Sequence, residues 1–211
     1  MTDALVFCGG GPAEAALPAL HDPIVLAADG GAAEALRLGW HVDVLIGDLD
    51  SVTPEDLAAV QAAGGAVERH PQDKDRIDLE LALDRAAEMG ATRVVVAGGD
   101  GGRFDMVLAN ALVLASPRWA GLELDAVFGR ARLTVVRTRR ELAGAPGETV
   151  SLIALGGDAH GVRTQGLRWS LEGETLEAGA TRGISNEFSR TRATVSVEEG
   201  VVVAIVPGGE R

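Results

Sequence analysis

Cysteine and long apolar runs are the scarcest features of this sequence of 211 residues. Cys8 is the only cysteine, so an intrachain disulfide is excluded, and a lone thiol inside an apolar run is typical of a small core residue in a reducing cytoplasm. The longest apolar runs fall far short of the roughly 20 residues that a membrane-spanning helix needs. The first residues also lack the basic start and apolar stretch of a secretory signal. We therefore expect a cytoplasmic protein with no membrane as a partner.

Positive charge is scarce as well, since the net charge is −12. The one basic run is Arg137-Thr138-Arg139-Arg140, too short to follow a phosphate backbone, and nucleic acid is therefore disfavoured as a partner. None of the four histidines has a cysteine or histidine neighbour at ligand spacing, which leaves a zinc site without support. The sequence also lacks a G-x-x-x-x-G-K-[ST] loop, and its glycines at 9–11 lack the spacing G-x-G-x-x-G. A P-loop kinase and a nicotinamide fingerprint are thus not indicated.

The chain up to about residue 130 alternates strand-like and helix-like segments. Hydrophobic residues make up 46% of the whole chain, enough for a sizeable core. Helices are expected at 13–20, 32–39, 54–63, 76–89 and 103–115. Thr53 is expected to cap the third of these, with Pro54 in its first turn. Repeated alternation predicts a parallel sheet flanked by helices on both faces.

From about residue 132 the pattern changes to short β-rich runs separated by glycine-containing turns, with no convincing helix. This pattern predicts a second, antiparallel domain of about 80 residues, built as a β-sandwich. The expected division is therefore an α/β domain at 1–131 followed by a smaller all-β sandwich domain at 132–211. No long linker separates the two.

Eight aspartates follow the strand-like runs of the first domain. They are Asp29, Asp48, Asp50, Asp73, Asp75, Asp78, Asp100 and Asp105. The carboxyl ends of parallel strands meet along one edge of a sheet, so these carboxylates are expected around one crevice. Carboxylates gathered without cations raise one another's pKa, which makes such a cluster unfavourable unless a positive group occupies it. A divalent metal ion is the simplest candidate.

Magnesium suits this edge, because it prefers hard oxygen ligands and commonly binds one or two carboxylates together with substrate phosphates. Asp48 and Asp50 lie two apart in a segment expected to be extended, so both should point to the same side. Asp78, in the first turn of the next helix, completes the expected ligand set. The sequence therefore predicts a magnesium site built from these three residues.

Phosphate groups would find partners at the same edge. Lys74 and Arg103 carry positive charge that is expected to neutralise phosphate. The glycines at 30–31 and 98–102 are expected to let backbone N–H groups approach phosphate closely. A phosphate-bearing substrate is therefore expected beside the metal.

Structural roles compete with these functional ones. Taken alone, each aspartate is more typical of a turn or a helix cap than of a ligand. Trp169 is more often a core residue than part of a binding surface, and Ser185-Asn186 is ordinarily a turn. The clustering at one sheet edge is what favours metal binding by the three aspartates named above.

Six motifs occur in order along the chain. They are ADGGA (28–32), DVLIGDLDS (43–51), DKDRIDLELAL (73–83), GGRFDMVLAN (101–110), GLRWSL (166–171) and RGISNEF (182–188). Together they resemble the thiamine pyrophosphokinase family, also called thiamine diphosphokinases, over nearly the whole chain. The resemblance implies an N-terminal α/β domain that binds ATP and Mg²⁺ and a C-terminal β-sandwich that binds thiamine. It also implies a homodimer whose active sites combine the α/β domain of one subunit with the β domain of the other.

The resemblance also implies roles for individual residues. It implies metal binding by Asp48, Asp50 and Asp78, a nucleotide and substrate site lined by Asp29 and Asp105, phosphate contact by Arg103, and thiamine binding by Trp169, Ser185 and Asn186. The implied reaction is attack of the thiamine hydroxyethyl oxygen on the β-phosphorus of ATP, which gives thiamine diphosphate and AMP. Asp73 and Asp105 are both candidates for accepting the hydroxyl proton. The family generally has Thr where this chain has Ile77, and often His where it has Met106.

Two other functions remain open. The same scaffold is compatible with diphosphate transfer to another hydroxymethyl heterocycle, such as a pterin, although Trp169 and the RGISNEF motif argue against a changed pocket. The second is a nucleotide-sensing module without turnover. Such a module has no need of three metal-binding aspartates and Arg103 in an arrangement suited to transfer.

Overall fold

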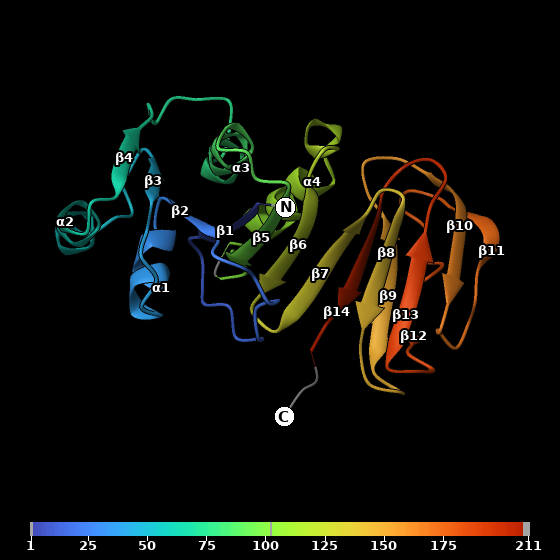
Figure 1. Cartoon of the computed structure of the whole chain (residues 1–211). Helices are drawn as coiled ribbons and strands as arrows, with labels where there is room; N and C mark the ends of the chain where they lie inside the picture. The colour runs from blue at the N-terminus through green and yellow to red at the C-terminus, as the bar shows by residue number, and fades with distance from the viewer. Residues whose placement is uncertain (1, 102, 209–211) are drawn as a thin grey trace. The chain divides into compact units, whose positions relative to one another are not determined.

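The computed structural model describes residues 2–101 and 103–208, and the chain divides into two compact units (Figure 1). The first unit contains Met1–Val113 and Gly121–Gly129, and the second contains Leu114–Ala120 and Arg130–Arg211. The predicted division lies slightly further on, after residue 131, and its assignment of nucleotide to one domain and thiamine to the other stays a prediction. Within the described residues, no helix is both long and apolar enough to cross a membrane.

Six strands form a parallel sheet in the described part of the first unit. They are β1 (Asp3–Cys8), β2 (Ile24–Ala28), β3 (Val44–Gly47), β4 (Ala66–Arg69), β5 (Arg93–Gly98) and β6 (Glu123–Phe128). Their order is β4-β3-β2-β1-β5-β6, and every neighbouring pair is parallel. β1 is buried along its whole length, because a central parallel strand is covered on both faces. The predicted parallel sheet is therefore confirmed.

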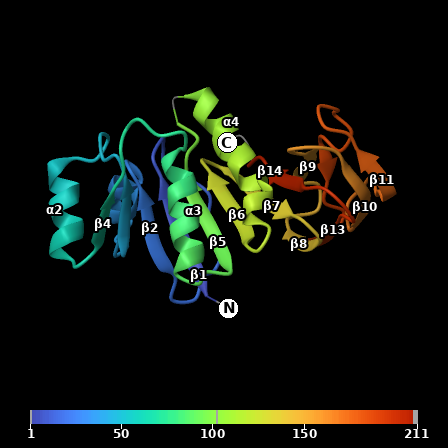
Figure 2. The same cartoon turned by 90° about the horizontal axis from the view of Figure 1, so that it is seen from above.

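Four α-helices flank this sheet in the described residues. They are α1 (Gly31–Arg37), α2 (Pro54–Ala62), α3 (Asp78–Glu88) and α4 (Phe104–Ala115). α1 and α2 share a core cluster with Leu5 and Phe7 of β1, whereas α3 packs against β1, β2 and β3 outside that cluster. Because successive strand side chains point to opposite faces, α1 and α2 cover one face and α3 covers the other. Figure 1 shows α1 and α3 on opposite sides of the strands, and Figure 2 shows α3 in front of the sheet. α2 begins as predicted, since the Asp56 N–H donates to Thr53 Oγ1 at 3.1 Å.

Two segments of the first unit differ from the sequence prediction. Residues 13–20 form no helix, because Pro18 has no N–H to donate and disfavours helical backbone at the residue before it. The N–H groups of Glu14 and Ala15 instead donate to Gly129 O just after β6, at 2.7 and 3.0 Å. β6 itself was not predicted, although all but its first residue are buried.

The second unit is a sandwich of two antiparallel sheets. Its elements are the 3₁₀ helix η1 (Pro117–Trp119) and the strands β7 (Ala131–Val136), β8 (Arg139–Ala143), β9 (Thr149–Ala154), β10 (Ala159–Gln165), β11 (Glu172–Leu176), β12 (Asn186–Glu187), β13 (Arg192–Ser196) and β14 (Val202–Val206). The strand orders are β12-β9-β14-β7 and β11-β10-β13-β8. One core cluster contains Leu152 of the first sheet with Val162 and Val195 of the second, so the sheets pack face to face. The predicted sandwich is confirmed, and β8, β11 and β12 are strands that the sequence pattern missed.

Candidate active site

A cavity of about 300 Å³ opens at the carboxyl ends of the first-unit strands. It is lined by Cys8, Gly9, Gly10, Ala28, Asp29, Gly30, Ser51, Ile77, Asp78, Leu79, Gly99, Gly101, Arg103, Met106 and Asn110. These residues belong to the ends of β1 and β2, to the loops after β1, β2, β3 and β5, and to α3 and α4 with the residues that lead into them. Ligands bind at this edge in open α/β folds. The structure thus has a cavity where the sequence predicts a crevice.

Three carboxylates meet beside this cavity. Asp29, Asp48 and Asp78 each offer one oxygen atom, and these atoms all lie within 4.8 Å of one another. Asp29 follows β2 with φ 46°, and Asp48 follows β3. Asp78 opens α3 slightly later than predicted, because Ile77 is still extended with ψ 158°. Three segments that are distant in sequence thus direct oxygen atoms to one point, and we call Asp29, Asp48 and Asp78 the carboxylate trio.

Lys74 lies between two members of the trio. Its Nζ is 3.3 Å from Asp48 Oδ2 and 3.1 Å from Asp78 Oδ1. The backbone N–H of Asp50 and the ammonium of Lys74 lower the pKa of Asp48. Burial raises the pKa of Asp78, and the charges of Asp29 and Asp48 add to this effect while Lys74 opposes it. The two pKa values move in opposite directions because Asp48 accepts a hydrogen bond from the backbone N–H of Asp50, whereas the cost of burial outweighs the effect of Lys74 at Asp78.

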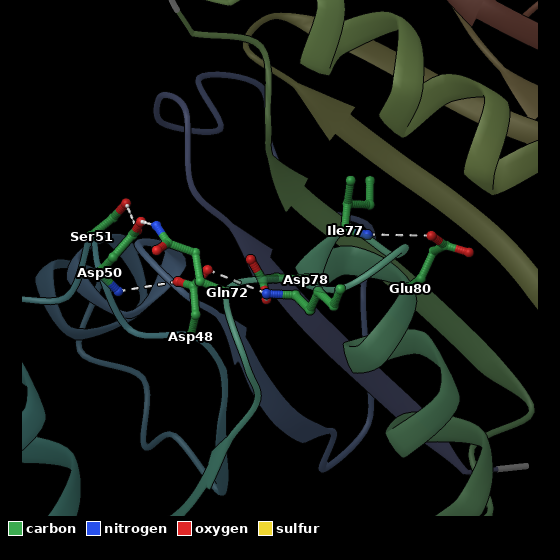
Figure 3. A network of polar contacts seen from close by, with 8 residues as sticks. Asp48, Asp50, Ser51, Gln72, Ile77, Asp78 and Glu80 are labelled. Atoms are coloured by element: carbon green, nitrogen blue, oxygen red, sulfur yellow. Dashed lines mark hydrogen bonds and ion pairs between the residues drawn. The ribbon is translucent and has the colours of Figure 1, made fainter.

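The backbone N–H of Asp50 donates to Asp48 Oδ1 at 3.2 Å, but the side chain of Asp50 points away from Asp48 and Asp78, toward Ser51 and Gln72 (Figure 3). Its Oδ1 accepts a hydrogen bond from Ser51 Oγ at 2.9 Å, and its Oδ2 accepts one from Gln72 Nε2 at 3.0 Å. The extended backbone expected for 48–50 is wrong, because Leu49 has φ 66° and turns the chain between the two aspartates. The role of Asp50 as a metal ligand stays a prediction, and Asp29 takes the place in the cluster that was predicted for Asp50.

The donor atoms of the trio suit a hard divalent cation. All three donors are carboxylates, without histidine or cysteine. Asp29 Oδ1 is buried and has no hydrogen-bond partner in the part of the chain that the structure describes, so a cation here would satisfy an atom that is costly to leave unpaired. Cys8 also lines the cavity, but burial and the charge of Asp78 raise the pKa of its thiol to about 12. Cys8 is therefore a neutral thiol at neutral pH, and its soft sulfur is poorly suited to a hard divalent cation.

The glycines of the predicted phosphate edge have two different roles. Gly30, Gly99 and Gly101 line the cavity. Gly31 is a packing residue, because a Cβ on it would lie 2.1 Å from Phe7 O, and its absence lets α1 begin directly against β1. Residue 102 of the predicted range 98–102 lies outside the described residues.

Arg103 lines the cavity and pairs with Asp105, whose Oδ2 lies 2.6 Å from Arg103 Nη2. Both side chains are exposed. The hydrogen bond from Arg103 lowers the pKa of Asp105, which keeps this carboxylate ionised at neutral pH. Asp73 is also exposed, and neither Asp73 nor Asp105 is among the lining residues. The two candidates for proton acceptance thus lie at the surface and outside the cavity lining.

Asn110 is a cavity residue that the sequence analysis missed. It is only 4% exposed, and its Nδ2 donates to Gly99 O at 3.2 Å. It lies four residues after Met106 on α4, a spacing that places both on one helix face and was the available signal. Ile77 and Met106 both line the cavity, so the two positions that depart from the family pattern present apolar surface there.

The second unit has a groove of its own, with a volume of about 660 Å³. It is lined by Arg168, Trp169, Ser170, Leu171, Thr181, Arg182, Gly183, Ile184 and Asn186. Trp169 is 52% exposed and is therefore not a core residue. The guanidinium of Arg168 lies 4.7 Å from the centroid of the Trp169 ring. The groove thus presents an aromatic face that already accepts a cation.

Asn186 fixes the backbone of Trp169 from the buried side. Its Oδ1 accepts from the Trp169 N–H at 3.1 Å and from the Glu187 N–H at 2.8 Å, and its Nδ2 donates to Trp169 O at 2.7 Å. Ser185 has φ 56°, and its N–H donates to Ser151 Oγ at 3.1 Å. Ser185 is not among the lining residues, so the structure brings Trp169 and Asn186 to the groove and leaves Ser185 beside it.

Two family models match the chain. The model described as thiamin pyrophosphokinase, catalytic domain, matches residues 19–124, and the model described as thiamin pyrophosphokinase, vitamin B1 binding domain, matches residues 134–202. The chain is also similar to a thiamine pyrophosphokinase from Bacillus subtilis (strain 168), with 27% identity over 169 residues that cover 75% of this chain and 75% of that protein.

Solved structures are similar over nearly the full length. A thiamin pyrophosphokinase from Geobacillus thermodenitrificans has 28% identity and a TM-score of 0.76, and the match covers 97% of this chain and 96% of that chain. A thiamine pyrophosphokinase structure from Bacillus subtilis has 23% identity and a TM-score of 0.83, with 100% of both chains covered. At this lower identity the second similarity shows the fold alone.

Proposed function

This chain belongs to the thiamin pyrophosphokinase family, and we propose that it transfers diphosphate from ATP to the hydroxyethyl oxygen of thiamine. The products are thiamine diphosphate and AMP. The observation that carries this proposal is the carboxylate trio beside a cavity at the sheet edge. Phosphoryl transfer depends mainly on the positioning of the reacting groups and on the neutralisation of phosphate charge. A cavity beside a metal-binding trio is suited to both.

We assign a divalent metal to the carboxylate trio and propose Mg²⁺ as the ion. A bound Mg²⁺ supplies positive charge to the phosphate oxygens of ATP. The unpaired, buried Oδ1 of Asp29 and the all-carboxylate donor set support this assignment. Asp50 remains a proposed further ligand, and this role requires its carboxylate to leave Gln72.

Other side chains at the cavity have proposed roles in binding and proton transfer. Arg103 lines the cavity with an exposed guanidinium, which suits it to bind phosphate oxygens when it separates from Asp105. Asp105 or Asp73 accepts the proton of the thiamine hydroxyl. Ile77 and Met106 present apolar surface beside the reacting phosphates and thereby limit the access of water.

We propose that thiamine binds in the second-unit groove, where Trp169, Asn186 and the neighbouring Ser185 lie. Thiamine carries a positive ring, and a cation over an aromatic face contributes roughly 0.5–2 kcal/mol. Arg168 already occupies such a position on Trp169, which supports the suitability of this face for a cationic ligand.

The assembly and location are also proposed. We propose a homodimer in which the first-unit cavity of one subunit works with the second-unit groove of the other, as the family resemblance implies. A cytoplasmic location is supported by the single unpaired cysteine.

The test is detection of AMP in three reactions: with thiamine, with a hydroxymethyl pterin and without an acceptor. We expect AMP and thiamine diphosphate to form together only when thiamine, ATP and Mg²⁺ are all present, and mass spectrometry identifies the product. AMP formed with the pterin and not with thiamine would identify a hydroxymethyl pterin as the acceptor. Nucleotide binding without AMP under any condition would indicate a sensing module. The Asp48→Asn protein serves as the control for contaminating activity.

A further inference from the structure

Lysine occurs once in this chain. Of its 19 lysine and arginine residues, Lys74 is the only lysine, and the other 18 (19 − 1) are arginine. The arginines make the other Lys- or Arg-carboxylate ion pairs found among the described residues, such as Arg76 with Asp84 and Arg85 with Glu68. The one ammonium group of a lysine side chain therefore lies at the carboxylate trio and nowhere else.

The position of this ammonium is that of a counter-ion. Lys74 Nζ contacts both Asp48 and Asp78 at 3.3 and 3.1 Å, and its side chain is only 15% exposed. The same two carboxylates offer oxygens to the trio, whose donor atoms lie within 4.8 Å of one another. Lys74 thus neutralises two of the three carboxylates that a divalent cation would use. Among the described residues, neither Asp29 Oδ1 nor Asp78 Oδ1 has a hydrogen-bond partner, but Asp78 Oδ1 has the ion pair with Lys74.

Two cations cannot share this position. A divalent ion bound to the trio would lie a few ångströms from Lys74 Nζ, where like charges repel strongly in a partly buried site. Lysine suits such a displacement, because its ammonium is a compact point charge on a flexible stem with rotatable donors. A guanidinium instead tends to bind a carboxylate through two parallel hydrogen bonds and is held by its planar geometry. Every other lysine-or-arginine position in this chain is arginine. The lysine at this position therefore favours release of the ammonium from Asp48 and Asp78.

We propose that Lys74 is an exchangeable internal cation. It neutralises Asp48 and Asp78 while the trio holds no metal, and it swings away from them when a divalent cation binds. Its ammonium then becomes available to phosphate oxygens of the nucleotide, and this last part rests on the proposed function. The exchange itself requires only the trio, Lys74 and a divalent cation, so it is testable without thiamine or ATP.

The single lysine makes the exchange directly visible. Protein labelled with ¹³C at the lysine ε-carbon gives one side-chain signal, which belongs to Lys74 without further assignment. We expect Mg²⁺ to shift this signal, with the same midpoint as Mg²⁺ binding measured by calorimetry on the same protein. Calorimetric binding of Mg²⁺ with an unmoved lysine signal would overturn the proposal.

Substitution separates exchange from a simple change of net charge. We expect Lys74→Met to bind Mg²⁺ about tenfold more tightly than the wild type, because the competing charge at contact distance is removed. Lys74→Arg should bind it more weakly than the wild type, since a guanidinium is harder to displace. Arg76→Met is the matched control: it removes one positive charge two residues away whose partners lie outside the trio, and its affinity should stay within about twofold of wild type.

The outcomes distinguish this proposal from the proposed function. Equal affinities of Lys74→Met and Arg76→Met, or no Mg²⁺ binding by either the wild type or Lys74→Met, would overturn the exchange. Thiamine-dependent AMP formation is measured separately on the wild type. Its absence from a protein that shows the exchange would refute the enzyme activity alone, and its presence in a protein that lacks the exchange would refute the exchange alone.

Discussion

Gly47 and Asp78 approach so closely that a Cβ atom on Gly47 would lie 2.9 Å from Asp78 Oδ1. The same atom would lie 3.2 Å from the Cβ of Asp29. Gly47 also has φ 146°, a conformation that residues with a side chain rarely adopt. A glycine at the end of β3 is therefore part of the carboxylate trio's geometry, although it has no side chain to contribute.

Gly47→Ala should lose activity by moving the trio. The new methyl group would displace Asp78, so we expect the rate of AMP formation to fall at least about a hundredfold, or 2.7 kcal/mol of transition-state stabilisation. The strained backbone should also lower the free energy of unfolding by about 1–3 kcal/mol. Gly64→Ala is the control. Gly64 also has a positive φ, 92°, but a Cβ on it would meet no other described residue within 4 Å apart from its chain neighbours. Urea unfolding and turnover are measured for both, and equal activity in the two variants would contradict this prediction.

The sheet edge was predictable because each buried run of the first unit ends where apolar residues give way to aspartate or glycine. The direction of the Asp50 side chain was not predictable, because Leu49 has φ 66°. No property of a leucine side chain indicates a positive φ. The close approach of Asp29 to Asp48 depends on the register of β2 against β3, which pairs Ala28 with Ile46. Such pairing comes from tertiary structure and leaves no mark in a single sequence.

The remaining differences have similar causes. The helix expected at 13–20 had a suitable apolar pattern, but the backbone limits imposed by Pro18 outweigh that pattern. The exposure of Trp169 could not be predicted, because Trp169 lies in the connection between β10 and β11, where no strand alternation assigns a side chain to a buried or an exposed face. Its position in a groove follows from the buried Asn186, whose three hydrogen bonds exist only after β12 has formed.

The ligand set is tested by a series of Asp→Asn variants. We expect Asp29→Asn and Asp48→Asn to reduce kcat by several orders of magnitude, since a loss under tenfold, ~1.4 kcal/mol, is too small for a direct ligand. Asp78→Asn should reduce kcat equally without lowering the melting temperature of the metal-free protein at pH 7. Burial raises the pKa of Asp78, so the ionised carboxylate lowers the free energy of unfolding when the pH is above that pKa. This destabilisation disappears at acidic pH, where the carboxyl group is protonated in both the folded and the unfolded state.

Asp50→Asn decides the role of Asp50. The sequence predicts a loss as large as that of Asp48→Asn, which requires the Asp50 carboxylate to turn from Ser51 and Gln72 into the site. Asp56→Asn is the control, because Asp56 belongs to the cap of α2. A tenth or more of wild-type kcat in Asp50→Asn would remove Asp50 from the ligand set.

Cys8 should be inert at neutral pH despite its place in the cavity wall. Burial raises the pKa of its thiol to about 12, so at pH 8 we expect alkylation by iodoacetamide to be at least about a hundredfold slower in the folded protein than in urea. As pH rises, this thiol ionises first in the unfolded chain, which stabilises the unfolded state. The contribution of the neutral, buried thiol to the free energy of unfolding is therefore fully present below about pH 9 and is lost as pH approaches 12. Cys8→Ala should therefore lose less stability between pH 9 and 11 than the wild type. Equal alkylation rates with and without urea would show that the thiol is accessible.

Trp169→Ala should raise the KM for thiamine far more than the KM for ATP. The side chain is half-exposed, so its removal leaves the core intact. We expect the KM for thiamine to rise about tenfold, in line with a lost cation–π contact, and the KM for ATP to stay within about twofold. Asn186→Ala is a useful comparison, since it removes three hydrogen bonds from a buried site and should destabilise the protein by about 1–3 kcal/mol. If both KM values rise together in Trp169→Ala, the groove is not the thiamine site.

A mixture of two variants, each impaired in a different half of the site, tests the composite active site. Asp48→Asn subunits have an intact second-unit groove, and Trp169→Ala subunits have an intact carboxylate trio. In a hybrid dimer, one of the two sites would then receive both intact halves and the other would receive neither. Random re-assortment gives about half hybrids, each with one good site of two, so activity should recover to about a quarter of wild type at subsaturating thiamine. Mass spectrometry under native conditions confirms that hybrids have formed. Hybrids that form and remain as inactive as the separate variants would mean that each site is built within one chain.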